Sequence, residues 1–181
     1  MGYDPSLTGD KAALVVIAPP EKPGGKFRIL YKLQLHGVDF EAQATAIKRV
    51  CDSYSVEKMT IDTTGLGNGV YQLVRKFFPT VRGLHYSVEA KTMLVLKAQA
   101  VMRANRLEFD AGDKDLAAAF MAVKRELTAS GRSVTYTAGR STETGHGDLA
   151  WAAMHALSHE PLEEGTGLAS KRTKSFLEVS E

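Results

Sequence analysis

The sequence predicts an α/β fold built on a mixed sheet flanked by helices. Two apolar segments joined by a Gly24-Gly25 turn come first, and helical segments then alternate with short apolar segments. A hairpin pairs its strands antiparallel, whereas strands that alternate with helices are typical of parallel pairing. A sheet that contains both kinds of pairing follows.

Alternation, caps and breakers define the elements of the first half. Apolar and polar residues alternate in FRILYKLQL, as in a half-buried strand, and Pro19-Pro20 close the apolar run before it. Asp39 is a good N-cap for a helix, and Pro79 stops a later one. The expected elements are strands at 2–4, 12–18 and 27–35, a helix at 39–54, a strand at 58–61, a helix at 70–78 and a strand at 81–85.

The second half is mostly helical, with apolar side chains at helical spacing in AKTMLVLKAQAVMRA. The expected elements are a helix at 90–104, a short strand at 107–109, a helix at 114–127, a strand at 133–136 and a helix at 148–158. The polar, glycine-containing sequence that follows predicts a flexible tail. We therefore expect one domain over residues 1–159 and a tail or linker over 160–181.

Composition indicates the cellular compartment in which the protein is expected. The single cysteine, Cys51, excludes an intramolecular disulfide and is expected to be an ordinary core thiol on a helix. No apolar run approaches the roughly 20 residues of a membrane span, and the N-terminus lacks a signal pattern. The formal net charge of +2 is too small to indicate a nucleic-acid partner by itself. These features predict a cytoplasmic protein with no membrane partner.

Three acidic residues, far apart in sequence, are candidates for a metal site. Asp4 and Asp62 end predicted strands, and Asp148 opens the last predicted helix. Desolvating a carboxylate is costly unless a cation compensates it, and carboxylate oxygens suit Mg²⁺ or Mn²⁺. Simpler roles compete: a turn residue before Pro5, a turn cap for Asp62, and a dipole partner for Asp148.

The motifs DPSLTGD, IDTTGLGNG and HGDLAWA, in this order, resemble the nuclease domain of the large terminase subunit of tailed phages. The likeness covers residues 2 to about 158. It implies a ribonuclease H-like fold with a central mixed sheet of five or more strands, the first three antiparallel. It also implies that Asp4, Asp62 and Asp148 are catalytic ligands of two Mg²⁺ or Mn²⁺ ions, with Asp4 between them, and that the reaction is DNA hydrolysis leaving a 5′-phosphate.

The same resemblance implies partners. In the family, the nuclease domain follows an ATPase domain and works with double-stranded DNA, the small terminase subunit and the portal. Only three residues precede Asp4, which suggests that upstream sequence is missing. No G-x-x-x-x-G-K-[ST] motif occurs, so the ATPase motor is expected outside this chain.

Other residues could extend the site. His146, two residues before Asp148, could approach a metal ion or the phosphate. Lys91 and Arg140 are the preferred contacts to DNA phosphates, because each lies in a segment that enters or leaves the presumed site. Trp151 is expected to pack in the core rather than to stack on a base.

Four alternatives compete with a terminase nuclease. A junction resolvase or an integrase-like enzyme would use similar carboxylates. A docking module of the packaging motor could keep the fold without cutting DNA. The GLGNG turn loosely resembles a dinucleotide loop, but it lacks the third glycine and the later acidic residue. An actin-like phosphate-binding domain would need a second half, for which the chain is too short.

Overall fold

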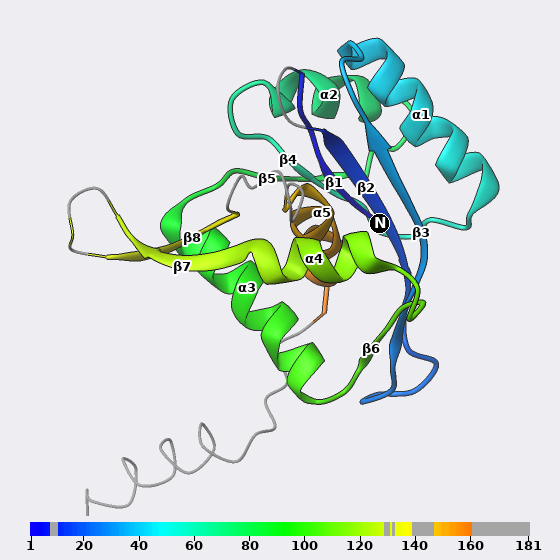
Figure 1. The fold of residues 1–181 in the computed structure, drawn as a ribbon. Helices are drawn as coiled ribbons and strands as arrows, with labels where there is room; N and C mark the ends of the chain where they lie inside the picture. The colour runs from blue at the N-terminus through cyan, green and yellow to red at the C-terminus, as the bar shows by residue number, and fades with distance from the viewer. Residues whose placement is uncertain (8–10, 129–130, 132, 139–146, 161–181) are drawn as a thin grey trace, which may run out of the picture.

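The computed structural model describes residues 1–7, 11–128, 131, 133–138 and 147–160. Within them, a six-stranded sheet and a separate two-stranded hairpin are surrounded by helices (Figure 1). The strands are β1 Gly2–Asp4, β2 Ala12–Ala18, β3 Phe27–Leu35, β4 Thr60–Asp62, β5 Arg82–Leu84, β6 Leu107–Glu108, β7 Val123–Leu127 and β8 Val134–Ala138. The helices are α1 Phe40–Ser53, α2 Gly67–Val74, α3 Val88–Arg103, α4 Lys114–Ala122 and α5 Asp148–Leu157.

The six-stranded sheet has the order β5-β4-β1-β2-β3-β6. Strand β2 is antiparallel to both β1 and β3, whereas β4 is parallel to β1 and β5, and β6 is parallel to β3. The mixed sheet and the antiparallel pairing of the first three strands are therefore confirmed. Strands β1 and β4, which carry two of the candidate acids, are neighbours in the interior of the sheet.

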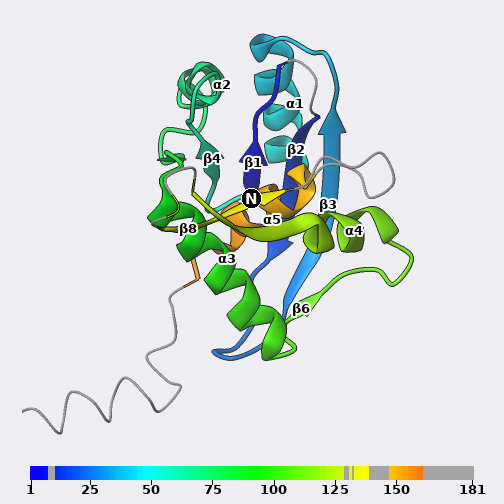
Figure 2. The same cartoon turned by 60° about the vertical axis from the view of Figure 1, so that its left-hand side comes forward.

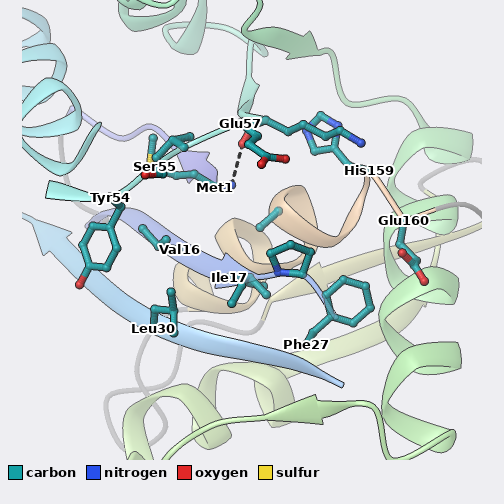
Figure 3. Close-up of a pocket in the computed structure, with 15 residues that line it drawn as sticks. Met1, Val16, Ile17, Phe27, Leu30, Tyr54, Ser55, Glu57, His159 and Glu160 are labelled. Carbon is teal, nitrogen blue, oxygen red and sulfur yellow. Dashed lines mark hydrogen bonds between the residues drawn. The ribbon is translucent and has the colours of Figure 1, made fainter. Parts of the chain in front are cut away.

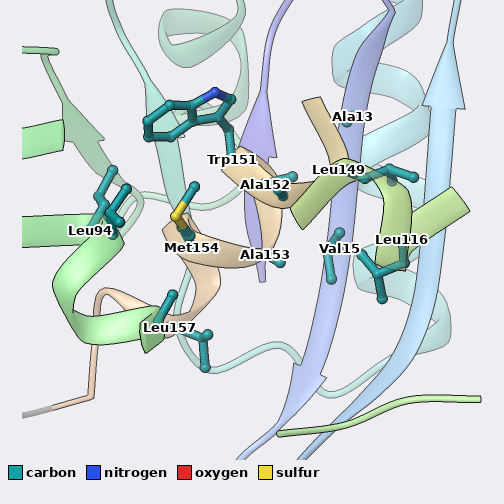
Figure 4. Close-up of a cluster of buried hydrophobic side chains, with 14 of the residues drawn as sticks. Ala13, Val15, Leu94, Leu116, Leu149, Trp151, Ala152, Ala153, Met154 and Leu157 are labelled. Carbon is teal, nitrogen blue, oxygen red and sulfur yellow. The ribbon is translucent and has the colours of Figure 1, made fainter. Parts of the chain in front are cut away.

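The sheet separates two apolar cores, and β2 contributes to both because its side chains alternate between the faces. Leu14 and Val16 pack with α1 and α2 on one face. Ala13 and Val15 pack with α3, α4 and α5 on the other, where Trp151 and its neighbours on α5 are buried (Figure 4). The turned view places α1 behind the sheet and α4 in front of it (Figure 2). The result is three layers, helix–sheet–helix.

Side-chain caps explain where three of the helices begin. Asp39, Ser87 and Asp113 each accept the backbone N–H of the third residue along, at the starts of α1, α3 and α4. The expected cap at Asp39 is thus confirmed. Helix α5 differs, because its N-cap is Gly147 and no side chain caps it. Asp148 instead lies in its first turn, where the helix dipole favours a negative charge.

Two expected helices have different bounds in the structure. The helix predicted over 114–127 ends at Ala122, and Val123–Leu127 form β7, paired antiparallel with β8. The sequence KREL has good helix propensity, but cross-strand pairing in the hairpin outweighs it. Helix α2 begins at Gly67, three residues before the expected start, and ends at Val74. The expected tail over 160–181 lies outside the described residues except for Glu160.

Two smaller expectations concern the thiol and the membrane. Cys51 is free and half-buried on α1, and burial raises the pKa of its thiol, as befits a packing residue rather than a nucleophile. No helix in the described part of the chain is both long enough and apolar enough to cross a bilayer.

Candidate active site

Asp4 and Asp62 end adjacent parallel strands. The register pairs Gly2 with Thr60 and Tyr3 with Ile61, so the two acids occupy the next position on β1 and β4. Asp4 is half-buried, and Asp62 is only 8% exposed. Carboxyl ends of parallel strands form the usual binding edge of α/β sheets. The two acids therefore lie at one edge, in a partly desolvated setting.

Helix α5 brings Asp148 toward the same edge. The helix packs directly on β1 and β2 and also reaches β4. This close approach depends on Gly2, because a Cβ there would lie 2.0 Å from the Ala152 carbonyl oxygen and 2.4 Å from the Ala156 nitrogen. With no side chain at that point, α5 can lie against the backbone of β1. Asp148, at the start of α5, has its Oδ2 atom buried.

All three acids act on one side chain, Tyr86, which follows β5. Burial is the main cause that raises the pKa of the Tyr86 phenol well above its ordinary range, and the negative charges of Asp4, Asp62 and Asp148 add to it. Carboxylates from the beginning, middle and end of the chain thus share one neighbourhood. Among the described residues, however, no three His, Cys, Asp or Glu side chains form a ready-made metal-binding group.

The surroundings of Asp62 favour a fixed side chain. Its Oδ1 accepts hydrogen bonds from the Thr64 backbone N at 2.8 Å and from the Thr64 hydroxyl at 2.6 Å. Burial raises the pKa of the Asp62 carboxyl, whereas the Thr64 bonds and the charges of Lys91 and His85 lower it, with a net rise. The turn cap expected for Asp62 is present. It uses one carboxylate oxygen, so it is compatible with a second role for this acid.

Comparison with known proteins identifies the family of the chain. Residues 1–160 match the model of the family described as the terminase RNaseH-like domain. The chain belongs to this family. It is 51% identical over 178 residues to the "Terminase, ATPase subunit" of Escherichia phage P2, covering 98% of this chain and 30% of that protein. It is 35% identical over 164 residues to the "Probable terminase, ATPase subunit" of Haemophilus phage HP1, covering 90% of this chain and 27% of that protein.

Solved structures share the terminase fold. The large terminase nuclease of the thermophilic phage G20c with bound magnesium superposes with a TM-score of 0.72 at 19% identity, covering 87% of this chain and 79% of that one. The HK97 bacteriophage large terminase gives a TM-score of 0.67 at 13% identity, covering 87% and 38%. The manganese-bound g2p nuclease domain of phage SPP1 gives 0.56 at 13% identity, covering 86% and 82%. The expected ribonuclease H-like fold is therefore confirmed, and the chain spans less than a third of the phage P2 and HP1 relatives.

The family match also excludes most of the alternative functions considered for this sequence. Membership of a terminase family sets aside a junction resolvase, an integrase-like enzyme, a dinucleotide-binding domain and an actin-like domain. A docking module that keeps the terminase fold without cutting is not separated from a nuclease by fold or family, so activity must decide between them.

Of the residues expected to contact DNA, Lys91 lies beside the acids of the terminase domain. Its Nζ is 5.0 Å from the centre of the Tyr86 ring and 5.6 Å from that of Trp151, and its charge lowers the pKa of Asp62. Trp151 is buried at 6% exposure, as expected. Arg140, the other expected DNA contact, and His146, the expected metal or phosphate contact, lie outside the described residues.

Sequence reasoning missed the hydrogen-bonded pair formed by Tyr86, which is partly buried, and His155, which is fully buried. The Tyr86 hydroxyl lies 2.9 Å from His155 Nε2, and His155 Nδ1 lies 2.9 Å from the Tyr3 carbonyl oxygen. Burial lowers the pKa of His155 to about 4, opposed by its bond to Tyr3, so the imidazole is neutral at ordinary pH. A signal was available, since His155 follows Asp148 by seven residues and so shares its helix face.

Gln43 on α1 holds the other side of β1. Gln43 is fully buried, and its Oε1 accepts the Tyr3 hydroxyl proton at 2.7 Å. Its Nε2 donates to the carbonyl oxygens of Ser6, at 2.7 Å, and Val38, at 3.0 Å. The backbone on both sides of Asp4 is therefore fixed from the α1 face, while His155 fixes it from the α5 face.

A cavity of about 370 Å³ lies at the other end of β1 and is mostly apolar (Figure 3). Its lining includes Met1, Phe27, Tyr54 and His159, and none of the three candidate acids. The candidate active site of this terminase domain is therefore defined by its converging carboxylates and not by this cavity.

Proposed function

We propose that the chain is the metal-dependent endonuclease domain of a phage DNA-packaging terminase, which hydrolyses phosphodiester bonds of double-stranded DNA to cut concatemeric genomes. One observation carries the proposal: Asp4 and Asp62 end adjacent parallel strands, and helix α5, which begins with Asp148, packs against β1 and β4. Three carboxylates in one partly buried place repel one another, and a divalent cation relieves that repulsion.

The donor set fits Mg²⁺ or Mn²⁺. All three side chains offer hard carboxylate oxygens, which these ions prefer. Burial already disfavours the charged form of Asp62, and Oδ2 of Asp148 is buried as well. A cation would offset both desolvation costs. The structures of other large terminase nucleases with magnesium, cobalt and manganese support this choice of ion class.

The residues then take distinct roles. Asp4, on the interior strand β1, would hold both ions, and Asp62 and Asp148 would each hold one. Two bound ions supply an activated water and stabilise the leaving oxygen of the phosphodiester. Lys91 would bind a phosphate of the DNA beside the acids. His146 is proposed as an additional metal or phosphate contact and Arg140 as an additional phosphate contact.

The wider assignment follows from the relatives. Because phage P2 and HP1 proteins of the family are described as terminase ATPase subunits, we assign the chain to the same kind of polypeptide, with an ATPase domain as its partner. The small terminase subunit and the portal complete the proposed assembly, in the host cytoplasm. Residues 1–159 would form the nuclease domain, and residues 160–181 a tail or linker.

The test replaces each acid by its amide. Asp4→Asn, Asp62→Asn and Asp148→Asn should each lower Mn²⁺-dependent nicking of supercoiled plasmid by more than about a hundredfold, because loss of a direct ligand exceeds the 10–100-fold typical of outer contacts. Melting temperatures should show that each variant folds. Asp52→Asn, at an exposed position of α1, is the matched control and should cut like the parent protein.

Two results would contradict the proposal. Cutting that persists in EDTA would remove the metal from the reaction. A folded parent protein that binds DNA but never nicks it in Mn²⁺ would favour the docking module instead.

A further inference from the structure

A run of hydrogen bonds begins at Asp62 and leads away from it. The Thr64 hydroxyl donates to Asp62 Oδ1 at 2.6 Å and accepts the backbone N–H of Tyr86 at 2.8 Å. The loop after β4 is thereby bonded to the start of the segment that leads into α3. Thr64 is exposed, so this link lies at the rim of the site and not in the core.

The run continues through Tyr86 to α5 and β1. The Tyr86 hydroxyl bonds to His155 Nε2 at 2.9 Å, and His155 Nδ1 bonds to the Tyr3 carbonyl oxygen at 2.9 Å. Tyr3 directly precedes Asp4, and His155 lies on the same helix as Asp148. Side chains and backbone therefore connect the three elements that carry the three acids.

The direction of donation in these hydrogen bonds is fixed. His155 is fully buried and neutral, and a carbonyl oxygen can only accept, so its single ring proton must be on Nδ1. Nε2 then accepts the proton of the Tyr86 hydroxyl. The Tyr86 hydroxyl therefore donates its proton to His155 and not to a carboxylate.

We propose that Thr64, Tyr86 and His155 are positioning residues that hold Asp62, Asp4 and Asp148 at the spacing that divalent cations require. This inference rests on the function proposed above. Without a cation the carboxylates repel one another, and mobile supports would let them move apart. The hydrogen bonds of Thr64, Tyr86 and His155 resist that movement, so the cations bind to a site that is already assembled.

The test is Mn²⁺ binding by calorimetry, without DNA, to Tyr86→Phe, which removes a single hydroxyl group. The dissociation constant should rise about tenfold, as for loss of other outer supports. Thr60→Val is the matched control, because the Thr60 hydroxyl also links β4 to the end of α5, by bonds of 3.2 Å to Ser158 and 2.8 Å to His159. It should bind Mn²⁺ like the parent protein.

Melting temperature separates positioning from stability. Both variants lose a hydrogen-bonded hydroxyl, so both should melt lower by roughly 2–4 °C. A merely structural role for Tyr86 would give the same melting shift with parent-like Mn²⁺ affinity, and that outcome would overturn the inference.

A second pair of variants tests the exposed link. Thr64→Val removes the hydroxyl and should also weaken Mn²⁺ binding about tenfold, whereas Thr64→Ser keeps it and should bind like the parent. Equal Mn²⁺ affinities in the two Thr64 variants would contradict a positioning role for the Thr64 hydrogen bonds. Failure of the parent protein to bind Mn²⁺ would instead overturn the proposed function itself, so the two failures are distinct.

Discussion

Gly2→Ala tests whether contact between α5 and β1 sets the active site. The new Cβ would lie 2.0 Å from the Ala152 carbonyl oxygen, 2.4 Å from the Ala156 nitrogen and 2.8 Å from His155 Cβ, where ordinary contacts are 3.4–4 Å. Two of these neighbours are backbone atoms of a buried helix, which no side-chain rotation can move away. The helix must therefore shift off β1, by on the order of 1 Å.

The expected magnitude has two parts. Overpacking of a core costs about 1–3 kcal/mol, and a domain of this size loses about 2–4 °C of melting temperature per kcal/mol, so a fall of roughly 2–12 °C is expected. Because the shift carries Asp148 away from Asp4, nicking should fall by about a hundredfold, the cost of misplacing a reacting group by about 1 Å.

The assay compares thermal unfolding and Mn²⁺-dependent plasmid nicking. Gly112→Ala is the control, since Gly112 is exposed and its Cβ would meet only one side-chain atom, Asp110 Oδ1, at 3.0 Å. It should match the parent protein in both measurements. If Gly2→Ala melted and cut like the parent, the contact between α5 and β1 would not be what sets the site.

Three further predictions test charge and burial around the acids. Lys91→Met should weaken binding of double-stranded DNA and reduce the salt dependence of log K by about one, whereas Lys48→Met on the exposed face of α1 should change neither in a filter-binding titration. Burial raises the pKa of Asp62 in the folded protein. At a pH above that pKa, the ionised carboxylate therefore lowers the stability of the fold. In acid this loss disappears, because Asp62 is protonated in both the folded and the unfolded state. Asp62→Asn in EDTA should therefore melt above the parent at about pH 7, and the gap should close as the pH falls below about 4; a constant gap would contradict the argument. Gln43→Met should lower the stability to urea by about 1–3 kcal/mol, because it leaves the Tyr3 hydroxyl without its acceptor, and parent-like stability would show that water replaces Gln43.

The sequence predicted best what local chemistry controls. The alternation of FRILYKLQL predicted β3 with its observed bounds, and Asp39 predicted the start of α1, because neither depends on distant contacts. The segment 123–127 was misassigned because its strand character comes from a partner, β8, that lies further along the chain. Propensity within a window cannot report such a pairing.

The same division applies to the candidate site. Strand ends and a helix start singled out Asp4, Asp62 and Asp148, because carboxylates at those places carry a desolvation cost that sequence context reveals. Tyr86 and His155 could not be singled out in this way. Each is an ordinary residue of a core by sequence, and their roles depend on a hydrogen bond between residues 69 positions apart.

The position of α5 in the chain has a consequence for timing during synthesis. This helix is the last described element, yet it covers the first strand and the second. A chain still lacking α5 leaves the parts of β1 and β2 that this helix covers exposed to water and contains only two of the three carboxylates. In the nuclease proposed above, the set of three acids is therefore complete only after translation has passed residue 148 and the helix has docked.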